Sequence, residues 1–177
     1  MNYSEEVQKF RDEREGNIIK SEDSPLSKEI REKIKNLPFF PINEKFRIIV
    51  EFEKRGKPKE TEIVNKVGVT KTVNKIGKVE FLFLGSTEKH NLEVYKDPED
   101  NNVFTIFGDL TNNTNETYGA GRYVDLEQGQ KGEFYLDFNK ATSPYCSYSE
   151  KYPCPLIPRK NRLNIRIEAG EKYIGDH

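Results

Sequence analysis

The sequence contains few of the residues that usually build metal and redox centres. Its 177 residues include no tryptophan, one methionine, two cysteines and two histidines, and only 34% of them are hydrophobic. The longest apolar runs, such as FLFL and FRIIV, are far shorter than the roughly 20 residues of a membrane-spanning helix. The N-terminus, MNYSEEVQKFRDEREG, is too polar for a secretory signal. We therefore expect a soluble, cytoplasmic protein with no membrane segment.

A strong excess of positive charge is also missing. The chain carries 29 basic and 30 acidic residues, for a formal net charge of -1, whereas general nucleic-acid binders are markedly basic. Residues 54–78 do hold eight Lys and Arg against two Glu, but they include no aromatic side chain that could stack on a base. We interpret this stretch as a solvated strand edge, and nucleic acid is not an expected partner.

Aromatic residues are plentiful. The 11 Phe and 9 Tyr indicate a packed core, and the length suits one domain. Tyr3, Val7 and Phe10 recur at helical spacing, which predicts a first helix. A second helix is predicted over residues 24–37, where Pro38 ends it. Its apolar stripe is expected to pack on a sheet; the stripe consists of Leu26, Ile30, Ile34 and Leu37.

Strand-like segments then follow one another, with no long helical pattern between them. The fold class predicted is mainly β: a single antiparallel β-barrel or sandwich with two N-terminal helices packed on it. Residues 1–40 are expected to form the helical segment and residues 41–177 the β-rich domain of one folding unit. The predicted strands are residues 46–53, 61–67, 70–76, 78–84, 91–96, 103–108, 133–138 and 163–167.

Residues 107–154 hold the densest cluster of candidate site residues. Arg122 lies between Tyr118 and Tyr123, and its planar guanidinium suits a carboxylate or phosphate. The alternative is an internal ion pair with Asp137 on a neighbouring strand, and the sequence leaves both open. The GAG before Arg122 lacks the third glycine and following helix of a dinucleotide motif, which favours a structural bulge over an anion cradle.

The segment EFYLDFN adds a polar strand face. Alternation places Tyr135, Asp137 and Asn139 on one side of it. Together with Tyr145 in the following loop, these groups offer donors, acceptors and a proton-transfer group. The sequence thus predicts a ligand pocket around Arg122 and Asp137, shaped by Tyr118, Tyr123, Asn139 and Tyr145.

The two cysteines lie in a loop stiffened by four prolines, at positions 144, 153, 155 and 158. Cys146 and Cys154 are close enough in sequence to form a disulfide, which a reducing cytosol would oppose. Free thiols packed in the loop are the second alternative. A zinc site is the third, and it would need His90 or His177 as a further ligand.

Several short motifs in this chain resemble a known family. Taken together, SPL at residue 24, FFP at 39, GDLT at 108, TYGAGRY at 117, LDFN at 136, CPL at 154 and AGE at 169 are similar to the prokaryotic domain-of-unknown-function family 1684. The resemblance implies no activity, substrate or cofactor. It marks as motif positions Tyr118, Gly121, Arg122, Tyr123, Asp137, Asn139, Tyr145, Cys146, Cys154, Asn161, Arg162 and Glu168.

Two functions remain open at this point. The first is binding of a small polar or anionic ligand in the pocket around Arg122 and Asp137. The alternative is a structural or protein-interaction module without catalysis. No GxSxG motif is present, no cofactor or metal site is expected, and the sequence does not decide whether the protein is an enzyme.

Overall fold

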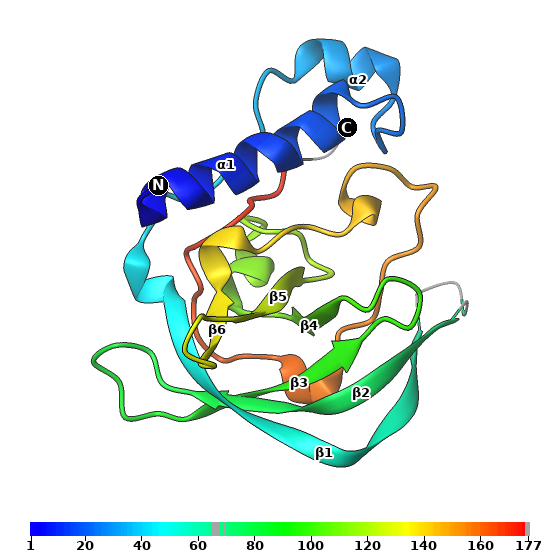
Figure 1. Ribbon diagram of the computed structural model, residues 1–177. Helices are drawn as coiled ribbons and strands as arrows, with labels where there is room; N and C mark the ends of the chain where they lie inside the picture. The colour runs from blue at the N-terminus through cyan, green and yellow to red at the C-terminus, as the bar shows by residue number, and fades with distance from the viewer. Residues whose placement is uncertain (65–67, 69, 176–177) are drawn as a thin grey trace.

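Six antiparallel strands and one long helix form the framework of the protein. The computed structural model describes residues 1–64, 68 and 70–175, and helix α1 (Tyr3–Glu15) lies across one end of the strands (Figure 1). Helix α2 (Lys28–Lys33) is a short piece beside it. The predicted antiparallel, mainly β fold with an N-terminal helix is confirmed. No helix in the described part of the chain is long and apolar enough to cross a membrane.

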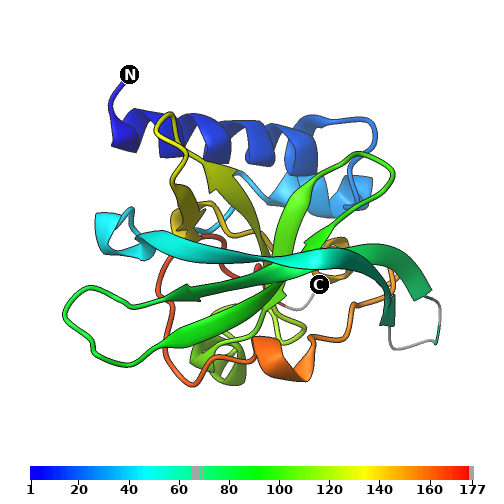
Figure 2. The same cartoon turned by 60° about the horizontal axis from the view of Figure 1, so that its bottom comes forward.

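The strands follow one another in chain order, and each pairs antiparallel with the next. The last strand pairs back onto the first, from Arg47 opposite Asp137 to Val50 opposite Phe134, so the strand order closes. Figure 2 shows the long first and second strands crossing the front of the molecule, with α1 above them. The strands are β1 (Arg47–Val64), β2 (Thr70–Phe81), β3 (His90–Lys96), β4 (Val103–Phe107), β5 (Arg122–Gln128) and β6 (Phe134–Asp137).

Four sequence predictions differ from these elements. The segments 70–76 and 78–84 form the single strand β2, which ends at Phe81. The segments 46–53 and 61–67 belong, as far as they are described, to the single strand β1; residues 65–67 lie outside the described part. Strand β5 was not predicted as a strand. Residues 163–167 form no strand, because their backbone is bound partly by side chains: the Ile167 amide donates to Asp109 Oδ2 at 2.7 Å.

The second predicted helix is shorter than expected and packs elsewhere. The Ser27 hydroxyl accepts from the Ile30 amide at its start, and the backbone is already extended at Ile34. The stripe expected on the sheet joins a separate cluster with Ile18 and Tyr148, so that prediction is wrong. The reason is position: α2 lies beyond α1, away from the strands (Figure 1).

The strands are packed on two faces. One face carries the main core, which includes Val79, Leu92 and Leu136. The opposite face of β2, β3 and β4 carries a second cluster, in which Tyr95 and Phe104 pack with Ile157. Ile157 comes from the proline-rich segment, residues 143–158, which therefore covers this second face.

Helix α1 is held mainly by polar contacts, although Val7 is fully buried. The Tyr3 hydroxyl lies 3.0 Å from both carboxylate oxygens of Asp137. One turn apart on the same helix, Arg11 donates to the Phe40 carbonyl at 2.9 Å and Arg14 Nε donates to Glu171 at 3.0 Å. Such bonds fix the helix's position along the strands more tightly than an apolar stripe would.

Candidate functional site

Arg122 holds the C-terminal segment against the strands. Its side chain is fully buried, and Nη2 lies 3.4 Å from Asp109 Oδ1 and 3.0 Å from the Ile167 carbonyl oxygen. Nη1 donates to the Ala169 carbonyl, and the guanidinium carbon lies 5.1 Å from the centre of the Phe107 ring. Burial lowers the pKa of Arg122 and the Asp109 carboxylate opposes that shift.

Gly121 sets the direction from which Arg122 enters. Its φ is +85°, and an added Cβ would lie 2.5 Å from the Phe107 carbonyl oxygen and 2.7 Å from Ile157 Cδ1. Only glycine meets both demands at low energy. The GAG motif forms a turn that leads into β5, in which the Gly121 amide donates to the Tyr118 carbonyl at 2.9 Å, and not the predicted bulge.

Asp137 and Asn139 belong to a second, separate network. Asp137 is buried and accepts bonds from the Tyr3 hydroxyl and from the Asn139 amide. Asn139 is fully buried; its side chain donates to the Asn43 carbonyl at 2.8 Å and accepts from the Asn43 amide at 2.9 Å. Burial raises the pKa of Asp137 above its usual value, against the lowering effect of these hydrogen bonds.

The structure therefore does not pair Arg122 with Asp137. The internal ion pair that the sequence left open as an alternative names the wrong partner for Arg122. On β6, Asp137 lies opposite Arg47 of β1, whereas Arg122 lies opposite Phe107 of β4. The ion-pair partner of Arg122 is Asp109. In both networks the charged groups are bound by other groups of the protein. A ligand role for Arg122, Asp137 and Asn139 stays a prediction.

The two thiols and Tyr118 form a third cluster. Cys146 and Cys154 are both free, the Tyr118 hydroxyl lies 3.2 Å from Cys154 Sγ, and the Cys154 thiol is near enough to influence the pKa of Cys146. Burial raises the pKa of the Cys146 thiol to about 12, so this thiol is protonated at neutral pH and is a poor nucleophile. His90 is buried between the Phe81 and Phe83 rings, and His177 lies outside the described residues.

The adjacent thiols predict an internal disulfide on oxidation. Treatment with a low-molecular-weight disulfide should transfer two hydrogens from Cys146 and Cys154 to the reagent, which leaves as two thiols. Closing this short loop should add about 2–3 kcal/mol of stability. Intact mass after alkylation in denaturant measures the outcome, with Cys154→Ser as the control that cannot close the bridge. Persistent mixed disulfides on the wild type would contradict the prediction.

An open groove lies between the second face of the sheet and the proline-rich segment. It consists of two adjoining cavities of about 500 and 440 Å³. The Thr142 and Tyr123 backbones are bonded to one another in both directions at 2.9 Å, and the Leu156 amide donates to the Val64 carbonyl at 2.8 Å. These bonds hold the segment over the groove. Both cavities are lined by Lys71, Tyr123, Thr142, Pro153 and Pro155.

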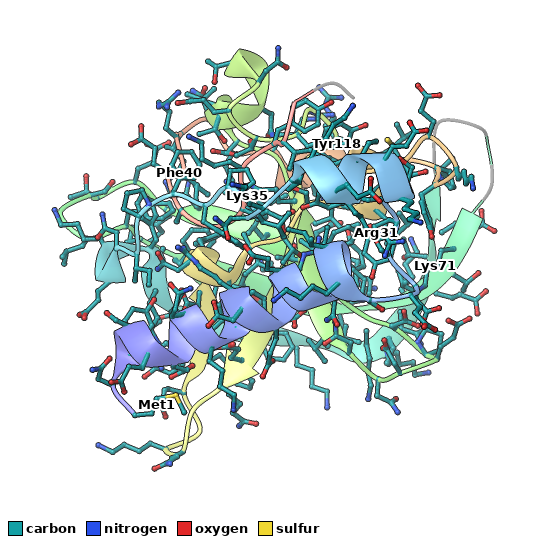
Figure 3. All side chains as sticks on the ribbon, turned by 90° about the horizontal axis from the view of Figure 1, so that it is seen from above. Met1, Arg31, Lys35, Phe40, Lys71 and Tyr118 are labelled. Atoms are coloured by element: carbon teal, nitrogen blue, oxygen red, sulfur yellow. The ribbon has the colours of Figure 1, made fainter. Side chains whose placement is uncertain are left out.

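The first cavity combines aromatic rings with charged groups. Phe104 and Asp125 are cross-strand partners on β4 and β5, and Asn102 donates to Asp125 at 3.1 Å. Lys71 Nζ lies 2.6 Å from Asp97 Oδ2, and this ion pair lines the same cavity. Figure 3 shows Lys71 at the edge of the molecule, near the described end of the β1–β2 hairpin.

The second cavity lies between the proline-rich segment and the end of α1. Tyr145, Tyr152 and Arg14 line it, with Cys146. The Arg14 guanidinium lies 5.8 Å from the centre of the Tyr145 ring, donates to the Ser143 carbonyl at 2.7 Å and pairs with the fully buried Glu171. Its charge is therefore compensated within the protein.

Two of the six predicted ligand contacts, Tyr123 and Tyr145, line the groove. Lys71, Asp97 and Asp125 also line the groove and were not predicted from the sequence. A usable signal was the alternation in RYVDLEQ, which places Tyr123 and Asp125 on one face once residues 122–128 are recognised as a strand. No sequence signal connects Lys71 to that face.

Comparison with known proteins agrees with this fold but states no activity. The chain matches the family described as "Protein of unknown function (DUF1684)" over residues 32–172. An uncharacterized protein of Haloarcula marismortui, solved by NMR in solution, is similar to it with a TM-score of 0.76 and 26% identity, over 99% of this chain and 96% of that one. No curated protein matches. The chain belongs to this family, the proteins of unknown function DUF1684, as its motifs indicated.

Proposed function

We propose that this protein binds a small polar ligand in the groove between the second face of its sheet and the proline-rich segment. The observation that carries the proposal is the groove itself. Its first cavity, of about 500 Å³, falls within the range of about 300–1,000 Å³ that is typical of small-molecule sites. A closed antiparallel barrel suits this role, since it gives the groove one rigid wall.

The lining supports a polar rather than a purely apolar ligand. Aromatic side chains alternate with groups that donate or accept hydrogen bonds, as in sites where a few polar atoms fix the ligand's orientation. The phenol of Tyr123 is a hydrogen-bond donor at neutral pH, and burial raises its pKa to about 12, so it stays protonated at alkaline pH as well. Among the described residues no group of three or more His, Cys, Asp or Glu could hold a metal ion.

A groove-filling substitution tests the proposal. Thr142 lines both cavities, so Thr142→Tyr should place a ring inside the groove. Proton–nitrogen correlation NMR with a panel of small amines, carboxylates, alcohols and amides should find compounds that shift the groove residues of the wild type. We expect Thr142→Tyr to weaken their binding by about tenfold or more.

Thr87→Tyr is the matched control. Thr87 is exposed in the loop between β2 and β3, which Figure 1 shows at the opposite end of the strands from the proline-rich segment. The control should bind the same compounds as tightly as the wild type does. If no compound shifts the groove residues, or if Thr142→Tyr binds unchanged, the groove is not a ligand site and the structural-module alternative is the better description.

A further inference from the structure

We infer that the Asp125 end of the groove recognises an organic ammonium group on the ligand. The inference rests on the proposed function and names the chemistry that the first cavity selects. Three side chains on one face of the β4–β5 strand pair support it. Phe104 lies opposite Asp125 in the β4–β5 register, Tyr123 is two residues earlier on the same face, and the two rings are 5.8 Å apart.

Charge compensation differs sharply among the groups of the groove. Asp97 is neutralised by Lys71 at 2.6 Å and Arg14 by Glu171 at 3.0 Å. Among the residues that the structure describes, Asp125 has no ion-pair partner; its recorded contact is the Asn102 amide at 3.1 Å. This carboxylate is therefore the charge in the groove that a ligand could compensate.

The surroundings of Asp125 reinforce its preference for a cation. Asp125 is exposed at the open side of the groove. The protein atoms around it raise its pKa by partial desolvation, the Asn102 bond opposes that rise, and the charges of Glu127 and Asp100 add to it. Lys140 acts in the other direction, but its ammonium is already held by Glu6 at 2.6 Å and Glu127 at 2.9 Å. A ligand cation at Asp125 would relieve this repulsion and lower the pKa of Asp125 again.

The two rings favour an organic cation over a metal ion. An ammonium group gains from aromatic faces as well as from a carboxylate, and its carbon chain can pack along Phe104 and Tyr123. A hard metal ion requires several oxygen ligands, and no cluster of three His, Cys, Asp or Glu occurs among the described residues. Asp125, Phe104 and Tyr123 together are suited to a cationic nitrogen with an apolar substituent.

A charged and a neutral probe of the same shape test the inference. Butylammonium chloride and butan-1-ol are titrated into the wild type by NMR at matched ionic strength. We expect butylammonium to bind about tenfold more tightly than butanol, and Asp125→Asn to remove most of that preference. Asp23→Asn, which removes one exposed carboxylate near α2, should leave it unchanged.

Two outcomes overturn the inference, and they differ from failure of the proposed function. If the two probes bind equally, or if Asp125→Asn keeps the preference for butylammonium, ammonium recognition at Asp125 is wrong. The groove then still stands as a ligand site, provided that other compounds of the panel shift its residues. If no compound of any class shifts them, both proposals fall together.

Discussion

Replacing Arg122 by alanine is expected to lower the free energy of unfolding by about 3–5 kcal/mol, the range for breaking a buried ion pair from one side. The substitution would leave the buried Asp109 carboxylate without its cation. It would also remove the donor to the carbonyls of Ile167 and Ala169. Because residues 163–167 lack a strand partner, these bonds are part of what holds the C-terminal segment in place.

Urea unfolding measures this effect, with Arg159→Ala as the matched control. Arg159 is exposed, and removing its side chain should change stability by no more than about 0.5 kcal/mol. Arg122→Lys keeps the charge but loses the planar fork, so it should fall between wild type and Arg122→Ala. An Arg122→Ala protein as stable as the wild type would show that the network does not hold the segment.

Replacing Asn161 by alanine is expected to lower the free energy of unfolding by roughly 3 kcal/mol, because several buried partners lose their hydrogen bonds at once. The fully buried Asn161 accepts from the Glu93 amide at 2.8 Å and donates to the Ile106 carbonyl at 2.8 Å. It thus joins β3 to β4 beyond the part where the two strands pair directly, since the only paired residues recorded for them are Tyr95 with Phe104 and Lys96 with Val103. The side-chain amide of Asn161 thus makes hydrogen bonds to β3 and β4 of the kind that a backbone peptide group makes in a sheet.

Thermal and urea unfolding of Asn161→Ala, beside Asn164→Ala, test this role. Asn164 is exposed, so its substitution should have little effect. Hydrogen exchange should also quicken at Glu93, whose amide loses its acceptor. Equal stability of the two variants would mean that β3 and β4 do not depend on the Asn161 bridge.

The sequence predicted those helices and strands that can be recognised from a short run of neighbouring residues. The apolar and β-branched residues of FRIIVEF and VFTIF mark β1 and β4 directly, and helix α1 follows from Tyr3, Val7 and Phe10. Strand β5 was missed because RYVDLEQ contains a single β-branched residue and three charged ones, Arg122, Asp125 and Glu127. Residues 163–167 mislead for the opposite reason, since their alternation serves packing while Arg122 and Asp109 bind their backbone.

The candidate site was less predictable than the fold. Residues such as Arg122 and Asn139 look functional in sequence, yet they satisfy buried backbone groups, which the sequence does not reveal. The groove depends on bringing β5, the β1–β2 hairpin and the proline-rich segment together. Lys71 lies in β2 and Asp97 directly after β3, and only the fold brings their charged atoms within 2.6 Å.

The most direct test is to map, residue by residue, where butylammonium binds to the uniformly labelled wild type. We expect chemical-shift changes at the amides of Asn102, Phe104, Tyr123 and Asp125, with Arg122 and Asp137 unaffected. Shifts centred on Arg122 or Asp137 instead would place the ligand site back in the buried networks and contradict the assignment of function to the groove.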